Sequence, residues 1–302
     1  QLSAVIEQIN NTGYGLTLGI HSRIEAFAET VFRNTIAGNT YINRNMVGAV
    51  VGVNPFGGRG LSGTGPKAGG PNYLLRFSTT NNKEEHQQEF LIDLENTRPV
   101  NTDIANNTVK VMAKWQSTSI DNRLSIIGQC NPEFLPVIEV IAREKLANPI
   151  QLPGPTGEDN RLSLHGRGPI LILVRECDSP SDADSQIASA LVSGCPVIIA
   201  TDQSHTSRFE SIQAAYKQAG LADGLVQLTH MASARELILK DEIAAVVANS
   251  CGQDSSLLRT AMAARKGSII PLIEWPKTDD GYSYHWLLWF LSERTRTENL
   301  VA

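Results

Sequence analysis

The stretch "GRGPILILVRECDSPSDADSQIASALVSGCPVIIAT", residues 166–201, sets out a strand, a helix and a second strand in one short run. Two continuous apolar runs, 169–174 and 196–201, are typical of strands that are buried on both faces of a sheet. Between them, "SDADSQIASALVSG" opens on capping residues and ends on a glycine, as a helix does. Two buried strands joined by a helix predict a parallel pair with a crossover connection.

The same alternation continues toward the C-terminus. Further short apolar runs occupy 225–229, 243–249 and 268–273. The segments between the runs have helical patterns: "HTSRFESIQAAYKQAG", "SARELILKD" and "QDSSLLRTAMAARKG". Strands that alternate with helices of this length predict an α/β fold with a doubly wound parallel sheet, which we assign to residues 153–302. The Pro- and Gly-rich segment "LPGPTGEDN" (152–160) predicts a linker at the start of this unit.

Two further units are predicted on the N-terminal side. Residues 81–152 combine a polar, acidic stretch with two or three helical patterns, of which "EFLPVIEVIAREKLA" from Glu133 is the clearest, so we expect a helical connector. Residues 1–80 begin with a helix and have a second helical pattern at 23–36. Strands are expected in this first unit at 16–21, 39–44 and 73–79.

A glycine-rich loop, "NPFGGRGLSGTGPKAGGP" (54–71), satisfies the dinucleotide-binding pattern with Gly58, Gly60 and Gly63. That pattern binds a pyrophosphate only when a helix follows it at once. Here Thr64-Gly65-Pro66 and further glycines follow, which cannot open a helix. The loop is therefore not predicted to hold a nucleotide.

The composition limits the function classes. Of the 302 residues, 41% are hydrophobic and 19% are charged, the balance of a soluble globular protein. A formal net charge of -5 argues against nucleic-acid binding. No apolar run is long enough to span a membrane, and "SYHWLLWFL" (283–291) comes closest. Because "QLSAVIEQIN" lacks a Met and starts within an amphipathic helix pattern, we expect the chain to be cut from a longer protein.

The four cysteines, Cys130, Cys177, Cys195 and Cys251, form no CxxC pair and no Cys/His cluster with metal-ligand spacing. We expect reduced thiols, a cytoplasmic location and no metal site. Cys130 lies between two helical patterns and is followed by Asn-Pro, so we interpret it as a helix-end residue and not as a nucleophile.

Three segments carry a family resemblance: "YGLTLGIHSR", "AGNTYINRNMVGAVVGVNPFGG" and "GLSGTGPKAGGP". Residues 1 to about 80 resemble the C-terminal end of an aldehyde dehydrogenase catalytic domain. Within that superfamily they resemble the pyrroline-5-carboxylate (glutamate semialdehyde) dehydrogenase part of the proline utilization A proteins. The resemblance implies that the glycine-rich loop closes the catalytic domain and is not the cofactor cradle.

The same resemblance implies roles for three residues. Gly48 and Ala49 match the aldehyde anchor loop, whose backbone N–H groups hold the α-carboxylate of glutamate semialdehyde or glutamate. Small residues suit this role because the backbone can approach an anion closely. Phe56 matches the aromatic residue that packs on the aliphatic part of the substrate, with core packing as the alternative. The family's nucleophilic cysteine and its ribose-binding glutamate belong to motifs that precede Gln1, so no catalytic residue is expected in this chain.

The C-terminal unit resembles, more weakly, the nucleotide-binding half of the same superfamily, as in proline utilization A proteins with an extra aldehyde-dehydrogenase-like domain. Its cofactor positions are altered. Thr201 stands where a lysine would hold the adenosine ribose, and the pyrophosphate turn reads "NSCGQDSS" (249–256). Glu274 falls at the general-base position, but Trp275-Pro276 replaces the Gly-Gly that would follow it. We therefore expect this unit to bind no cofactor.

The implied parent protein is bifunctional: it oxidises proline with FAD and then glutamate semialdehyde to glutamate with NAD. This chain would supply the anchor loop and a non-catalytic domain that covers the dehydrogenase and its internal channel. The upstream domains of the same protein are the implied partners, with possible homo-oligomers and peripheral attachment of the parent to the inner membrane. One alternative is a purely structural, self-associating module, and another is a cysteine enzyme built on Cys251.

The aromatic segment near the C-terminus gives a last expectation. Between residues 281 and 291 the alternating aromatic side chains predict a strand, which is either an ordinary core strand of the C-terminal unit or one that extends a sheet toward the dehydrogenase part. The tail that follows, residues 292–302, is expected to be dispensable for the fold.

Overall fold

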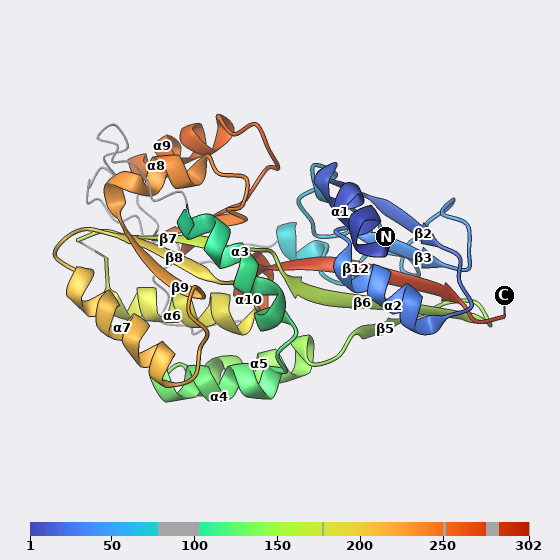
Figure 1. Ribbon diagram of the computed structural model, residues 1–302, viewed down its shortest axis with the longest axis horizontal. Helices are drawn as coiled ribbons and strands as arrows, with labels where there is room; N and C mark the ends of the chain where they lie inside the picture. The colour runs from blue at the N-terminus through green and yellow to red at the C-terminus, as the bar shows by residue number, and fades with distance from the viewer. Residues whose placement is uncertain (78–102, 177, 250–251, 276–283, 302) are drawn as a thin grey trace.

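The computed structural model describes residues 1–302 except 78–102, 177, 250–251, 276–283 and 302. It contains two five-stranded sheets and a two-stranded one. Figure 1 shows the two large sheets in different lobes, with the long strands β6 and β12 running between them. Both termini lie in the lobe that contains β2 and β3.

One lobe is built on a parallel sheet of order β11-β10-β7-β8-β9. The strands are β7 (Ile170–Val174), β8 (Val197–Thr201), β9 (Val226–His230), β10 (Ala245–Asn249) and β11 (Leu272–Trp275). The first strand, β7, lies in the middle, and the chain winds outward to β9 before it crosses over to β10 and β11. This order confirms the predicted doubly wound sheet. Every residue of β7, β8 and β10 is buried, as the continuous apolar runs indicated.

Helices cover both faces of the parallel sheet because successive side chains of a strand point to opposite faces. On β7, Ile170, Ile172 and Val174 join one hydrophobic core, while Leu171 and Leu173 join another. The first core is covered by α4 (Ile120–Cys130), α5 (Leu135–Leu146), α6 (Pro180–Val192), α7 (Thr206–Gln218) and α10 (Tyr284–Phe290). The second is covered by η2 (Met231–Ser233), α8 (Ala234–Ile238) and α9 (Gly252–Ala263), with Ala105 of α3 (Asp103–Gln116).

The other lobe is built on a mixed sheet of order β2-β3-β12-β6-β5. The strands are β2 (Thr17–Ile20), β3 (Asn39–Ile42), β5 (Ile150–Leu152), β6 (Glu158–Gly166) and β12 (Leu291–Asn299). Strand β12 is the middle one: it pairs in parallel with β3 and antiparallel with β6. The remaining elements are α1 (Leu2–Asn11), β1 (Tyr14–Gly15), α2 (Glu25–Asn34), β4 (Arg59–Gly60) and η1 (Leu74–Phe77). This sheet takes strands from all three predicted units, and the division at 80 and 152 stays a prediction.

The helices expected at the N-terminus, at 23–36 and from Glu133 are confirmed, and Cys130 is the last residue of α4. Other expectations were wrong. Residues 74–77 form a 3-10 helix instead of a strand, and β5 and β6 form an antiparallel pair across the predicted linker. The last strand of the parallel sheet begins at Leu272, later than the apolar run predicted.

The C-terminal segment needed the largest correction. Residues 284–290 form helix α10 and not an alternating strand. The strand follows it, as β12, and this polar segment is the one that pairs with β3 of the N-terminal unit. Because β12 is a middle strand, its position argues against the expectation that residues 292–302 are dispensable for the fold.

Candidate functional site

The loop after β3 presents two adjacent backbone N–H groups that take no partner from the described part of the chain. Gly48 and Ala49 are exposed, and Gly48 has a φ of 84°, a left-handed conformation that glycine adopts without strain. The flanking N–H groups are paired: that of Val47 donates to Asn45 Oδ1 (3.1 Å) and that of Val50 to Asn54 Oδ1 (3.3 Å). The two flanking N–H groups are thus hydrogen-bonded within the loop, whereas those of Gly48 and Ala49 have no partner among the described residues. Two adjacent free N–H donors can bind an anion.

Asn54 fastens this loop to the C-terminal strands. Its side chain is 3% exposed, and its backbone N–H donates to the carbonyl of Val50 (2.7 Å). The Nδ2 group donates to Asn160 Oδ1 on β6 and to Thr297 Oγ1 on β12, both at 3.1 Å. Sequence reasoning missed this residue, because nothing in a sequence shows which distant strand a loop asparagine will reach.

Phe56 lies at the start of the glycine-rich loop, where its backbone forms a two-way hydrogen-bonded bridge with Ala68 (3.0 Å each way). Its side chain is 36% exposed and belongs to none of the hydrophobic cores of the described residues. This exposure argues against the core-packing alternative, and contact with a substrate stays a prediction.

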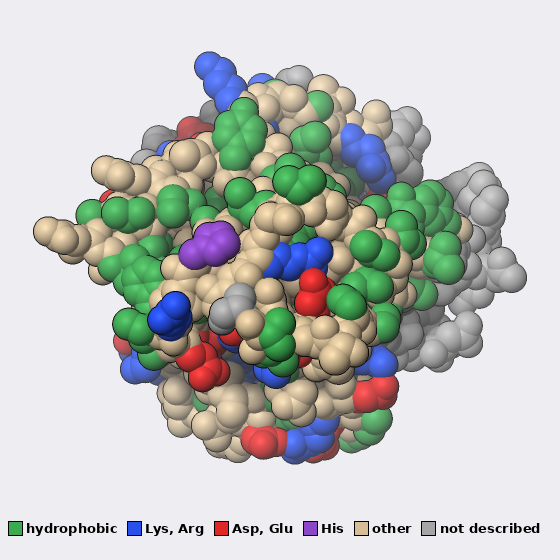
Figure 2. Space-filling view, turned by 90° about the vertical axis from the view of Figure 1, so that its right-hand side faces the viewer, with side chains coloured by type: hydrophobic (Ala, Val, Ile, Leu, Met, Phe, Trp, Pro, Cys, Tyr) green, Lys and Arg blue, Asp and Glu red, His purple; other side chains and the backbone are tan. Residues whose placement is uncertain are grey.

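Hydrophobic side chains are also exposed along the loop itself: Met46, Val47, Val50 and Val51. Figure 2 shows hydrophobic side chains spread over the face at this end of the molecule. Apolar surface of this kind often marks a contact with another protein segment.

The glycines of the apparent nucleotide fingerprint have a local structural role. A Cβ at Gly58 would come within 2.4 Å of the carbonyl of Ser62, and Gly60 has a φ of 62°. The loop turns back on itself there, and no helix begins between Gly63 and Asn72. The prediction that no helix opens directly after this glycine pattern is confirmed, and the absence of a bound nucleotide stays a prediction.

A buried polar cluster lies beneath the glycine-rich loop, and sequence reasoning missed it too. Lys67 is 2% exposed, and its Nζ donates to Asn39 Oδ1 (2.7 Å) and to the carbonyl of Gly57 (2.5 Å). Its backbone N–H donates to Glu293 Oε2 on β12 (2.5 Å). Burial lowers the pKa of Lys67 to about 7, against the opposing effect of Glu293. The only sequence signal was a lysine inside a loop of small residues.

The crevice of the parallel sheet differs from a nucleotide site. In such sheets ligands bind beyond the carboxyl ends of the strands where the winding direction reverses, here between β7 and β10. A buried ion pair occupies this position: Arg175 Nη2 lies 2.8 Å from Asp178 Oδ1, and Arg175 Nη2 also reaches the carbonyl of Asn249 (3.5 Å). Gln186 Nε2 donates to Asn249 Oδ1 (2.7 Å). These described side chains thus bind one another at the ends of β7 and β10.

Two other residues, Thr201 and Glu274, stand at positions that correspond to the family's cofactor site. Thr201 is buried at the end of β8, and Glu274 forms an ion pair with Arg259 (2.8 Å). The described cysteines, Cys130 and Cys195, are free thiols, and burial raises the pKa of Cys195 to about 11. Cys177 and Cys251 lie outside the described residues. In the part of the chain that the structure covers, no group of three or more His, Cys, Asp or Glu residues could hold a metal ion. None of the described helices is both long and apolar enough to cross a bilayer.

Comparisons with known proteins agree with this geometry. Residues 1–82 match the aldehyde dehydrogenase family. The bifunctional protein PutA of Escherichia coli (strain K12) is 35% identical over 273 residues, which are 89% of this chain and 19% of that protein. The 1-pyrroline-5-carboxylate dehydrogenase 1 of Halalkalibacterium halodurans is 52% identical over 69 residues, 23% of this chain and 13% of that one. The chain therefore spans about a fifth of the length of the PutA relatives that it matches.

Solved structures show the same fold. Proline utilization A from Corynebacterium freiburgense superposes with a TM-score of 0.55 at 20% identity, over 99% of this chain and 24% of that one. Proline utilization A from Bradyrhizobium japonicum superposes with a TM-score of 0.53 at 19% identity, over 56% of this chain and 21% of that one. Residues 1–82 thus match the aldehyde dehydrogenase family, and the chain as a whole is similar to one segment of the bifunctional proline utilization A proteins.

Proposed function

We propose that this chain is part of a bifunctional proline-catabolic enzyme and supplies the substrate-carboxylate site of its glutamate semialdehyde dehydrogenase. The observation that carries the proposal is the pair of free N–H groups at Gly48 and Ala49, in a loop fixed on both sides. Two adjacent amide donors match a carboxylate in charge and in geometry. The names of the relatives, PutA and 1-pyrroline-5-carboxylate dehydrogenase, support the choice of substrate.

The division of labour follows from this proposal. The chain's own residues bind and orient the substrate by its carboxylate, while the nucleophile that attacks the aldehyde is assigned to residues outside this sequence. NAD accepts the hydride of the aldehyde and FAD the electrons of proline, each elsewhere in the whole protein, which we propose to act in the cytoplasm. The 302 residues alone are then inactive. The exposed apolar loop residues are proposed to pack against the remaining domains of the same protein.

Crystals of the full-length protein soaked with glutamate test the proposal directly. The expected result is a carboxylate within hydrogen-bond distance of the Gly48 and Ala49 nitrogens. Glutamate bound elsewhere in the dehydrogenase site, with this loop empty, would contradict the proposal.

Replacing Phe56 by alanine in the full-length enzyme is expected to raise KM for glutamate semialdehyde and to change kcat little. The ring would contact the aliphatic chain in both the ground state and the transition state, so its loss weakens uniform binding. A loss of about 1–3 kcal/mol, roughly 5- to 150-fold in kcat/KM, is expected for such a contact. Phe27→Ala is the matched control, because Phe27 is also exposed, at 39%. Equal kinetics of the two variants would show that Phe56 does not touch the substrate.

We also propose that the parallel-sheet unit binds no nicotinamide cofactor. The support is the buried Arg175–Asp178 pair, which follows strand β7 at the carboxyl edge of the sheet, and Thr201, which stands where the family has a lysine. Calorimetric titration of the full-length protein with NAD is expected to saturate at one site per chain, the site of the dehydrogenase. A second NAD site of micromolar affinity in each chain would contradict this assignment.

A further inference from the structure

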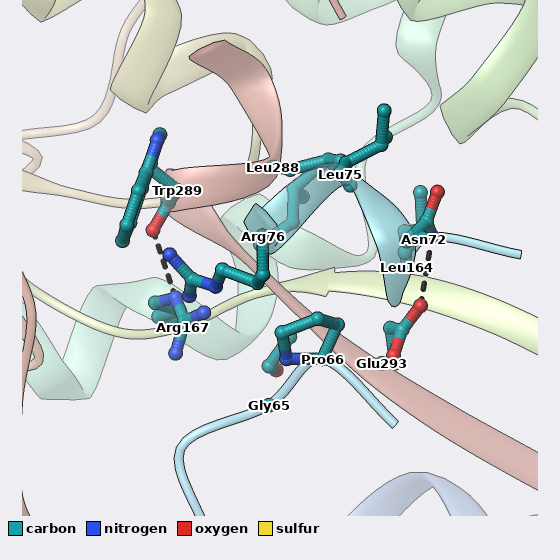
Figure 3. A pocket seen from close by; sticks show the side chains of 12 residues that line it. Gly65, Pro66, Asn72, Leu75, Arg76, Leu164, Arg167, Leu288, Trp289 and Glu293 are labelled. Carbon is teal, nitrogen blue, oxygen red and sulfur yellow. Dashed lines mark hydrogen bonds between the residues drawn. The ribbon is translucent and has the colours of Figure 1, made fainter. Parts of the chain in front are cut away.

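A small recess lies where the glycine-rich loop meets the start of β12, and the loop of residues 45–54 takes no part in it. It is shallow and partly open to solvent, with a cavity volume of about 30 Å³. Pro66, Leu75 and Arg76 line it from the dehydrogenase side, and Leu164, Arg167 and Trp289 from the other side. Figure 3 shows the side chains of Arg76 and Arg167 extending toward one another at one end of the recess.

The two arginines are held in place by aromatic and backbone contacts. The Arg76 guanidinium carbon lies 3.6 Å from the ring centroid of Trp289, a close cation–π contact. Arg167 donates through Nε to the carbonyl of Trp289 (2.8 Å) and through Nη1 to the carbonyl of Thr64 (3.1 Å). Among the described residues, neither guanidinium forms an ion pair with a carboxylate. Each therefore keeps N–H donors that are available to a ligand.

The carboxylate of Glu293 lines the recess, and its oxygens already accept hydrogen bonds. Glu293 accepts from Asn72 Nδ2 (2.7 Å) and from the backbone N–H of Lys67 (2.5 Å), so both of its oxygens have partners. Burial lowers the pKa of Arg167 to about 10; the positive charge of Arg76 adds to this effect, and the negative charge of Glu293 opposes it. The negative charge of Glu293 acts on both guanidinium groups, so one carboxylate faces two positive charges and a second anion would balance them.

The rest of the wall is apolar. Leu75, Leu164, Leu288 and Leu291 line the recess beside the arginines. An inorganic anion would leave this surface unused, whereas a short alkyl chain would cover it. Arginine pairs also match the planar, two-oxygen geometry of a carboxylate.

We propose that this recess is a binding site for a small aliphatic carboxylic acid. Its carboxylate accepts hydrogen bonds from Arg76 and Arg167, and its alkyl part lies against the leucines. The site is separate from the Gly48–Ala49 loop and does not depend on the function proposed for that loop. A ligand here contacts both the dehydrogenase segment and the first residues of β12.

Equilibrium dialysis of the full-length protein with radiolabelled butyrate tests the site. Because the Gly48–Ala49 loop is itself proposed to bind carboxylates, the measurements are made in the Ala49→Pro background. Butyrate is expected to bind saturably, and Arg76→Gln or Arg167→Gln to weaken it by about tenfold or more, as the loss of a charged hydrogen bond does. Arg161→Gln is the control: Arg161 lies on the same strand as Leu164 but is paired with Asp159.

Three results would overturn the proposal. One is no saturable butyrate binding up to about 50 mM, the weak limit for a site of this size. Another is equal binding by the Arg161→Gln and Arg76→Gln variants, both with melting temperatures like that of the parent. The third is displacement of butyrate by butylammonium, or tighter binding of inorganic phosphate, either of which would mean that the recess does not select an aliphatic carboxylate.

Discussion

Deletion of residues 292–302 from the full-length protein is expected to abolish the dehydrogenase activity and to unfold the mixed sheet. This segment contains nearly all of β12, which pairs with β6 along nine residue pairs and with β3 along four. Its buried Arg294 also donates to the carbonyls of Phe32 and Ala37, next to α2. Without β12, strand β3 loses its partner on the side away from β2.

The expected loss in the free energy of unfolding is large in comparison with the total stability of a domain. Each hydrogen bond contributes about 0.5–1.5 kcal/mol net, so a middle strand contributes more than about 5 kcal/mol, close to the whole stability of many domains. Hydrogen exchange of the amides of residues 39–42 and 158–166 reports the effect, together with the rate of glutamate semialdehyde oxidation. Deletion of residues 301–302 alone is the control, because Val301 is exposed and lies beyond β12. Full activity and protected amides after the longer deletion would contradict the role of β12.

Asn54→Ala is expected to raise KM for glutamate semialdehyde about 10- to 100-fold, since the loop that holds the substrate loses its anchor. The change removes the acceptor for the Val50 N–H and the donor to Asn160 and Thr297. Two of the partners left behind, Asn160 and Thr297, are buried, and each costs about 1–3 kcal/mol when unsatisfied. Part of this loss is expected as a lower free energy of unfolding and part as weaker substrate binding.

The measurement combines steady-state kinetics with denaturant unfolding. Asn148→Ala is the control, because Asn148 is exposed at the surface. If Asn54→Ala lowered stability but left KM equal to that of the control, the loop would be shown to hold its shape without the C-terminal strands.

The parallel sheet was predictable because its strands are buried on both faces and their sequences show it. Continuous apolar runs that are separated by helical patterns predict buried strands of a parallel sheet. The aromatic segment 284–290 was wrongly predicted as a strand because its pattern fits two periods. In helix α10 the buried Leu287 and Phe290 are three residues apart, yet alternate aromatic residues in a short segment also fit a strand. Seven residues are too few to separate the two periods.

Strand β12 escaped prediction because its buried residues are polar. Glu293, Arg294, Thr295 and Thr297 are all buried, and each is satisfied by a group distant in the sequence. Hydrophobic patterning cannot reveal such a strand, since its burial depends on partners in β3, β6 and the glycine-rich loop. The Gly48–Ala49 loop was found through family resemblance. Its attachment through Asn54 is a tertiary contact, which no local pattern encodes.

The most direct test of the carboxylate site is the kinetics of the Ala49→Pro variant of the full-length enzyme with two aldehydes. Proline removes one of the two free N–H groups. With glutamate semialdehyde, kcat/KM is expected to fall about 10- to 100-fold, the usual loss when a hydrogen bond to a charged group is removed. With butanal, which has no α-carboxylate, it is expected to stay the same. An equal fall for both aldehydes, or no fall for either, would contradict the claim that this loop holds the substrate's carboxylate.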